Sequence, residues 1–217
     1  MPRILPGETP LYALTDSRLS LGRSLREVAT ALLEAGIKIL QYREKKAPMA
    51  RKYEECKLLR ALTRDYDACL VVNDHIELAL ACECDGLHVG QDDLPLPALR
   101  RLAPGLMIGI STHSPAQALQ ARADGADYIG VGPIFATQTK EDVVAPVGFE
   151  YLDWVAGNLD LPFVAIGGIK AHNIFEVARH GANCCALVSE LVGAPDIGAK
   201  VAQTRAAMAK GIAARNA

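Results

Sequence analysis

The stretch VVND at residues 71–74, followed by GLHVGQDD at 86–93, decides the fold of this chain. Each stretch begins as a short apolar run rich in Val and Leu, and each ends abruptly in acidic and amide side chains. Short apolar runs with β-branched residues are typical of buried parallel strands. In a (β/α)8 barrel the active site lies at the C-terminal ends of the strands, where these polar groups would gather.

Strand-like runs and amphipathic segments alternate along the rest of the chain. We expect strands at Leu11–Thr15, Ile37–Arg43, Cys69–Asn73, Gly86–Val89, Met107–Ser111, Tyr128–Val131, Phe163–Ile166 and Cys185–Val188. We expect helices at Leu25–Ala35, Ala50–Arg64, Ile76–Cys82, Leu96–Leu102, Pro115–Ala123, Glu150–Val155, Asn173–His180 and Ile197–Ala213. This alternation, with no Gly/Ser linker, predicts an α/β fold with one domain over residues 1–217, a single (β/α)8 TIM barrel.

The alternative fold is an open, doubly wound sheet. Such sheets usually carry a G-x-G-x-x-G turn after the first strand. Here the first strand continues into Asp16-Ser17-Arg18 and the glycine turn is missing. We therefore favour the closed barrel.

Composition narrows the class of protein. The chain has 217 residues and a net charge of -2, which gives no basic footprint for nucleic acid. No apolar run approaches the roughly 20 residues of a membrane helix, and MPRILPGETP lacks the apolar core of a signal peptide. We expect a cytoplasmic protein without nucleic-acid or membrane partners, with its six cysteines reduced and buried. The sequence leaves a homodimer open.

Carboxylates end two neighbouring predicted strands. Asp74 follows one strand, and Asp92 and Asp93 follow the next. Carboxylates placed in this way can share Mg²⁺, which prefers oxygen ligands and usually bridges to substrate phosphates. The alternation of side chains indicates that only one of Asp92 and Asp93 faces the metal.

The second strand ends in QYREK at 41–45, where alternate side chains share a face. Gln41, Arg43 and Lys45 would then point the same way. One interpretation is a solvated surface charge run. We favour an anion site instead, because Arg suits bidentate phosphate recognition and buried cations are costly without an anion.

Polar and glycine-rich segments follow the later strands. The loop GPIFATQTK at 132–140 offers hydroxyls and an ammonium, although an ordinary polar loop would look similar. Gly167-Gly168 and Val188-Ser189 follow the seventh and eighth strands, whose loops commonly build a phosphate site in this fold. The histidines lack the spacing of a metal-binding pair, and we expect structural or solvated roles for His88, His172 and His180.

Six of these motifs in order resemble the thiamine-phosphate synthase family. They are QYREK at 41–45, VND at 72–74, GLHVGQDD at 86–93, GIST at 109–112, GVGPIFATQTK at 130–140 and AIGGI at 165–169. The resemblance runs from Leu11 to about Leu191. It implies a (β/α)8 barrel that joins 4-amino-2-methyl-5-(diphosphooxymethyl)pyrimidine to a hydroxyethylthiazole phosphate, with release of pyrophosphate.

The resemblance also implies roles for individual residues. Asp74 and Asp93 would ligate Mg²⁺. The pyrimidine diphosphate would be bound by Gln41, Tyr42, Arg43, Glu44, Lys45, Asn73, Ser111 and Lys140. The thiazole phosphate would be bound by Thr137, Gln138, Thr139, Gly168, Val188 and Ser189. Arg43, Lys45, Ser111 and Lys140 would act on the reacting groups. The departures from the family pattern are minor: Ala136 stands where Pro is common, and 141–144 varies a loosely patterned segment.

The implied chemistry agrees with the residues. Cations and Mg²⁺ would stabilise the departing pyrophosphate, while the electron-rich aminopyrimidine shares positive charge at its methylene, so a dissociative transition state is expected. A rival function is a thiazole tautomerase, which would leave the aspartates and the QYREK cations without a diphosphate. A second rival is a non-catalytic phosphate-binding barrel. Release of pyrophosphate from the paired substrates separates the three.

Overall fold

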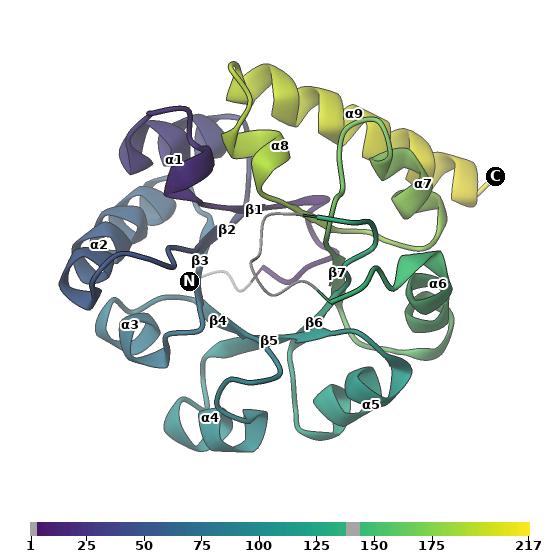
Figure 1. The fold of residues 1–217 in the computed structure, drawn as a ribbon, viewed down its shortest axis with the longest axis horizontal. Helices are drawn as coiled ribbons and strands as arrows, with labels where there is room; N and C mark the ends of the chain where they lie inside the picture. Colours follow the sequence, from purple (N-terminus) through teal and green to yellow (C-terminus); the bar gives the residue numbers. More distant parts are fainter. Residues whose placement is uncertain (1–3, 138–143) are drawn as a thin grey trace.

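Eight parallel strands close into a barrel in the computed structural model, which describes residues 4–137 and 144–217 (Figure 1). The strands are β1 (Leu11–Leu14), β2 (Ile39–Tyr42), β3 (Cys69–Asn73), β4 (Gly86–Val89), β5 (Met107–Thr112), β6 (Tyr128–Val131), β7 (Phe163–Ala165) and β8 (Cys185–Leu187). Each strand pairs with the next in sequence, and β8 pairs with β1. The predicted TIM barrel is confirmed.

Helices surround the barrel on all sides (Figure 1). They are α1 (Leu25–Glu34), α2 (Met49–Asp65), α3 (Ile76–Ala81), α4 (Leu96–Leu102), α5 (Pro115–Ala123), α6 (Gly148–Asn158), α7 (Ile174–Arg179), α8 (Ser189–Val192) and α9 (Ile197–Arg215). Among the helices of the described residues, none has the length and apolar character needed to cross a bilayer.

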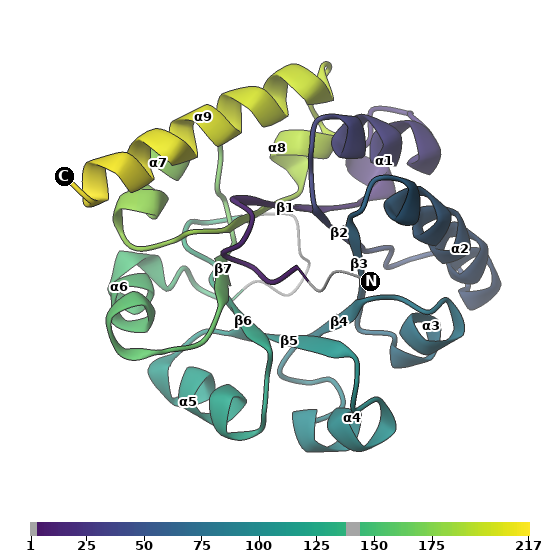
Figure 2. The ribbon, with the colours of Figure 1, turned by 180° about the vertical axis from the view of Figure 1, so that it is seen from behind.

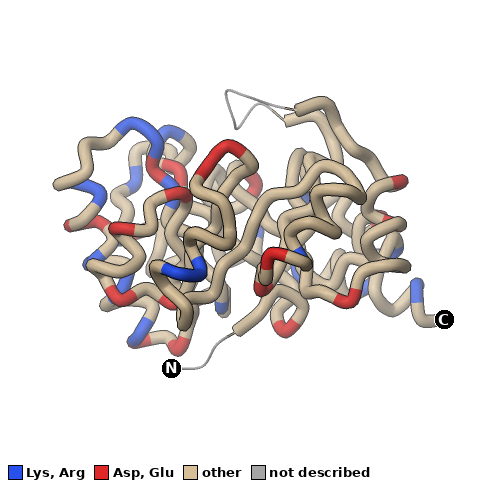
Figure 3. The backbone as a smooth tube through the Cα atoms, turned by 90° about the horizontal axis from the view of Figure 1, so that it is seen from below, with Lys and Arg blue, Asp and Glu red and all other residues tan. Residues whose placement is uncertain are grey.

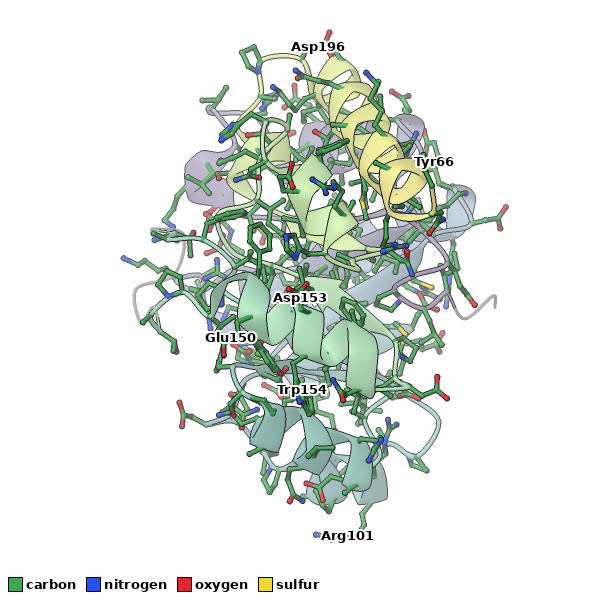
Figure 4. All side chains as sticks on the ribbon, turned by 90° about the vertical axis from the view of Figure 1, so that its right-hand side faces the viewer. Tyr66, Arg101, Glu150, Asp153, Trp154 and Asp196 are labelled. Atoms are coloured by element: carbon green, nitrogen blue, oxygen red, sulfur yellow. The ribbon has the colours of Figure 1, made fainter. Side chains whose placement is uncertain are left out.

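Local sequence explains several helix starts. Ser24 and Glu27 form a capping box at the start of α1, in which each side chain satisfies a backbone N–H of the other. Ser114 caps α5, where Pro115 occupies the first helical position. Asp196 caps α9 by accepting from the N–H of Ala199, at the end of the helix nearest the top of Figure 4.

Apolar side chains fill two separate layers. One layer lies between the strands and the helices and includes Leu32, Leu40, Leu87 and Ile129, all fully buried. The other fills the barrel itself, where Tyr12 and Tyr128 are the largest side chains. The barrel is therefore a packed core closed to solvent below its mouth, as expected for eight strands.

The N-terminal segment closes one end of the barrel. Residues 4–10 cross the opening on the side seen in Figure 2, and Ile4 and Leu5 pack against the interior cluster. The backbone N–H of Cys185 donates to the carbonyl of Pro10 at the start of the eighth strand. Among the described residues, the segment 4–10 thus covers the N-terminal end of the barrel.

The helical layer is also joined by polar contacts. On α6, Glu150, Asp153 and Trp154 lie along the outer side of the molecule (Figure 4). Asp153 lies 2.7 Å from Nδ1 of His180, just beyond α7. This contact joins the helices that follow β6 and β7.

Several element boundaries differ by one to three residues from the sequence-based expectation. β2 is shorter than Ile37–Arg43, because the N–H of Arg43 donates to Oγ1 of Thr15 instead of to a strand carbonyl. The short helix α8 was not expected at all, since a single turn carries too little periodicity to detect. The prediction that the six cysteines are free and buried is confirmed.

Candidate active site

Two carboxylates meet at the C-terminal end of the barrel. Asp74 directly follows β3, and Asp93 lies in the loop after β4, with its carboxyl in hydrogen-bond contact with that of Asp74. Asp93 also accepts from the N–H of Gly90 at 2.7 Å. Partial burial raises the pKa of the Asp93 carboxyl, and the adjacent Asp74 carboxylate adds to this effect. The pair therefore attracts either a proton or a cation.

One lysine also contacts this pair. Nζ of Lys45 lies 2.6 Å from Oδ2 of Asp74. Burial alone would raise the pKa of Asp74, but the Lys45 ammonium outweighs it and holds that pKa below its ordinary value. The backbone of Asp74 has a φ of 66°, a conformation that is uncommon outside glycine and asparagine. Such an outlier is held in place by its surroundings and is frequent at functional sites.

Arg43 lies at the same end and is almost completely buried. Its Nη1 lies 2.9 Å from Oδ2 of Asp16, and the two side chains are only 5% and 4% exposed. Asp16 also accepts from the Arg18 guanidinium at 3.1 Å. Asp16 thus accepts from two guanidinium groups at the mouth, and it holds the Arg43 guanidinium in position.

A chain of hydrogen bonds crosses the barrel interior beneath the mouth. Nε2 of Gln41 donates to the hydroxyl of Tyr12 at 2.7 Å, and this hydroxyl lies 3.1 Å from that of Tyr128. The Tyr128 hydroxyl lies 3.0 Å from Nδ1 of His88, whose Nε2 lies 3.1 Å from Oγ of Ser111. Every hydrogen bond in this chain can form when each group donates to the next one. His88 then donates to Oγ of Ser111, and the hydroxyl hydrogen of Ser111 is left to bind another group.

The two tyrosines of this hydrogen-bond network, Tyr12 and Tyr128, stay neutral. Burial raises the pKa of Tyr12 and of Tyr128. Gly109 makes room for the Tyr128 ring, because a Cβ at this position would lie 2.1 Å from the ring. The interior network, with both of its tyrosines neutral, thus holds Gln41 and Ser111 in place.

A cavity of about 660 Å³ opens at the C-terminal end. Predicted site residues that line it are Arg43, Ser111, Thr137, Gly168, Val188 and Ser189, together with His113 and Lys170, which were not predicted. Gly168 has a φ of +63°, and a Cβ there would lie 2.6 Å from the carbonyl oxygen of Ala136. Only glycine fits this close approach of two loops.

Three predicted residues lie outside the described part of the chain. They are Gln138, Thr139 and Lys140. The described loop residue before them, Thr137, lines the cavity. Thr137 and Ser189 therefore reach one chamber from the loop after β6 and from the end of β8.

The side chains of the QYREK segment do not all face the barrel. Tyr42 points to the helical layer, where its hydroxyl donates to Glu55 on α2 at 2.7 Å. Glu44 accepts from the hydroxyl of Ser17. The structure thus brings Gln41, Arg43 and Lys45 to the mouth and interior, and it directs Tyr42 and Glu44 toward other protein groups. Asn73 was also predicted to bind the pyrimidine diphosphate. It is the last residue of β3 and is partly exposed.

Sequence reasoning missed several residues of this site. Asp16 lies two residues after the end of β1, so its position near a strand end was a usable signal. His88 and Tyr128 occupy inward positions of their strands, and their roles become visible only from their contacts across the barrel. Asp92 and Asp93 are both exposed, and Asp93 is the one that contacts Asp74.

Known proteins were compared with the whole chain. The family model described as thiamine monophosphate synthase matches residues 11–191. The thiamine-phosphate synthase of Pelotomaculum thermopropionicum is 56% identical over 94% of this chain and 94% of its own length. That of Lawsonia intracellularis is 51% identical over 96% of this chain and 98% of its own. Among solved structures, thiamine phosphate pyrophosphorylase from Pyrococcus furiosus superposes with a TM-score of 0.86 at 36% identity, covering 94% of this chain and 96% of that one.

The fold and these relatives define the class of protein as a barrel enzyme, a transferase. Within that class, the chain belongs to the thiamine monophosphate synthase family, which acts in thiamine biosynthesis.

Proposed function

We propose that this enzyme condenses 4-amino-2-methyl-5-(diphosphooxymethyl)pyrimidine with 4-methyl-5-(2-phosphooxyethyl)thiazole to give thiamine phosphate and pyrophosphate. The observation that carries the proposal is the division of the mouth. Arg43, Lys45 and the Asp74–Asp93 pair lie at one side, and Thr137 and Ser189 line the chamber from another. A diphosphate and a phosphate need two such polar subsites around one reacting centre.

The donor set at the Asp74–Asp93 pair fits Mg²⁺. Two carboxylates in contact, one with a raised pKa, offer hard anionic oxygens that a divalent cation can share. Among residues 4–137 and 144–217, no group of three or more His, Cys, Asp or Glu side chains could hold a metal ion. Two protein carboxylates agree with the habit of Mg²⁺ of keeping waters and binding substrate phosphates. When bound, the ion would neutralise charge on the leaving pyrophosphate.

The side chains at this end of the site serve the leaving group. Arg43 offers a planar guanidinium, held in position by Asp16, and Lys45 offers a mobile ammonium on a half-exposed side chain. Both would bind pyrophosphate oxygens more strongly as charge develops on them, which lowers the barrier. Lys140 belongs to the same proposal from the sequence resemblance.

The interior network would hold the pyrimidine. Gln41 and Ser111 end a fixed chain of hydrogen bonds, and Ser111 lines the chamber. A ring held by fixed partners can lose pyrophosphate while its methylene faces the incoming thiazole nitrogen. None of the six cysteines lines the chamber formed by the described residues, so the bond exchange proceeds without a thiol nucleophile. The proposal includes a dissociative route, in which pyrophosphate leaves ahead of bond formation, supported by the cations placed to bind the leaving group.

The test is to mix the purified protein with each substrate alone and with both, with and without Mg²⁺. We expect pyrophosphate and thiamine phosphate in equal amounts only when both substrates and Mg²⁺ are present. Asp93→Asn should abolish the Mg²⁺-dependent turnover, whereas Asp92→Asn, at the neighbouring exposed carboxylate, is the matched control. Binding without turnover would favour the non-catalytic barrel, and conversion of a thiazole precursor alone would favour the tautomerase.

The proposed substrates are small molecules of thiamine biosynthesis. We propose a cytoplasmic location and no nucleic-acid partner, as expected from the sequence. A homodimer stays open, and the mass of the protein in solution decides it.

A further inference from the structure

Lys170 lines the chamber but belongs to none of the motifs that predicted the site. It lies five residues beyond the end of β7, and its Nζ lies 2.7 Å from Oγ of Ser189. Its side chain is one-third exposed. A lysine held against a serine hydroxyl at the wall of a chamber is placed to meet an anion inside it.

The charges around Lys170 leave its ammonium available. Glu190 lies 3.5 Å from Nζ of Lys170 and also 3.5 Å from Nζ of Lys200. The Glu190 carboxylate additionally accepts from the N–H of Ala171 at 3.0 Å. One carboxylate shared between two ammonium groups cannot neutralise both. Because Lys200 does not line the chamber, the surplus positive charge that an incoming anion meets is that of Lys170.

The backbone of Lys170 has a separate, structural role. Its N–H donates to Oδ1 of Asn173, and its carbonyl accepts from the N–H groups of Asn173 and Ile174 at the start of α7. These contacts do not involve the side chain. Replacing the side chain therefore leaves the loop anchored.

We propose that Lys170 binds the phosphate of the acceptor substrate together with Ser189, and that Glu190 weakens this contact by competing for the ammonium. The inference rests on the proposed function, because it assigns a phosphate to this side of the chamber. Lys170 then determines the preference for the phosphorylated thiazole over its free alcohol.

A simple structural role makes a different prediction. If the Lys170–Glu190 ion pair served only to join the loop after β7 to α8, removing either partner would disturb the chamber in the same direction. If Lys170 binds phosphate, removing Glu190 frees the ammonium and binding becomes tighter. The sign of the Glu190 effect therefore separates the two roles.

The experiment measures equilibrium binding of 4-methyl-5-(2-phosphooxyethyl)thiazole and of its free alcohol by calorimetry. Lys170→Met should weaken binding of the phosphate about 10- to 100-fold, as expected for loss of one charge-assisted contact. Binding of the alcohol should be unchanged. Lys170→Arg should restore most of the affinity, and Glu190→Gln should strengthen phosphate binding about threefold. Lys57→Met is the matched control, since Lys57 is an exposed lysine paired with Glu54 on α2.

Several outcomes would overturn the inference. Unchanged phosphate affinity in Lys170→Met, or weaker binding in both Lys170→Met and Glu190→Gln, would leave Lys170 with a structural role only. An equal loss for phosphate and alcohol would show a general distortion of the chamber. These results are separate from failure of the proposed function, which would appear as a wild-type protein that releases no pyrophosphate from the two substrates.

Discussion

At the N-terminal end of the barrel two partly buried acids each lie against an arginine, whereas at the C-terminal end two acids lie against each other. Asp85 precedes β4 and contacts Arg60 at 2.6 Å, and Asp127 precedes β6 and contacts Arg100. Each of these carboxylates also accepts a backbone N–H, from Leu70 at 2.8 Å and from Ile108 at 2.7 Å. Their charges are thus matched entirely within the protein.

The C-terminal end is arranged differently. Asp74 and Asp93 lie against each other and both interact with Lys45, and Asp16 accepts from both Arg43 and Arg18. Over the whole molecule, acidic and basic residues are interspersed in Figure 3, so the difference lies in how individual groups are paired. An internally matched charge stabilises the fold, whereas an imperfectly matched one is suited to a ligand of opposite charge. The comparison predicts that substitutions at the two ends affect different quantities.

The largest expected effect is on turnover in Asp74→Asn. Removing one of the paired carboxylates should lower kcat/KM about a thousandfold, as for loss of a preorganised charge that acts on the transition state. The free energy of unfolding should change by less than about 1 kcal/mol, because Asn tolerates the positive φ of Asp74 and the Lys45 side chain of the ion pair is half exposed. Steady-state kinetics across a Mg²⁺ titration, with urea unfolding in parallel, checks both values. Wild-type turnover and Mg²⁺ dependence would refute the assignment.

The second largest effect is expected in Asp85→Asn, which should lose stability and keep its turnover. Breaking the buried pair with Arg60 should lower the free energy of unfolding by about 3 kcal/mol. The kcat of the folded fraction should stay within about twofold of wild type, because Asp85 lies at the opposite end of the barrel. Urea unfolding measures the first value and kinetics well below the transition measures the second. The exposed Asp160→Asn serves as control, and a loss of kcat without loss of stability would contradict the division between the ends.

Substitutions within the C-terminal end should separate the two substrate subsites. Arg43→Ala and Lys45→Ala should each weaken use of the pyrimidine diphosphate by about 1.5–3 kcal/mol, the cost of a lost charge-assisted contact. Thr137→Val should instead raise the concentration of thiazole phosphate needed, because Thr137 lies in the loop after β6. Separate titrations of the two substrates reveal the partition. If the two effects are exchanged, the half-sites have been assigned backwards.

From the sequence alone we could predict which residues lie at the strand ends, but not which distant residues contact one another. Strand ends are local features, so Asp74 and Ser111 could be placed at the mouth from their position after or within short apolar runs. Alternation also implied that Tyr42 lies on the opposite face from Gln41, and its hydroxyl indeed contacts α2.

Contacts between distant residues could not be predicted in the same way. Asp16 pairs with Arg43 across two strands, and His88 contacts Tyr128 and Ser111 across the barrel. Such pairings depend on register and side-chain packing, which a single strand does not encode. Lys170 was missed for a related reason, since it lies beyond the strand end and reaches the chamber only through the path of its loop.

The smallest effect is expected for an exposed ion pair at the N-terminal end. It tests whether exposed pairs at this end contribute to the free energy of unfolding or only the more deeply buried pairs do. Arg64 lies in the last turn of α2 and contacts Glu83 at 2.8 Å, but the two side chains are 43% and 79% exposed. Arg64→Gln keeps the helix propensity nearly constant and removes the ion pair. The free energy of unfolding should therefore fall by no more than about 0.5 kcal/mol, and the change should shrink further in 0.5 M salt, where exposed charges are screened. Urea unfolding at low and high salt measures both effects against Asp85→Asn, whose more deeply buried pair should be far less sensitive to salt. A loss of 2 kcal/mol or more in Arg64→Gln would mean that burial does not separate the ion pairs at this end, and the contrast between matched and exposed charge would have to be abandoned there.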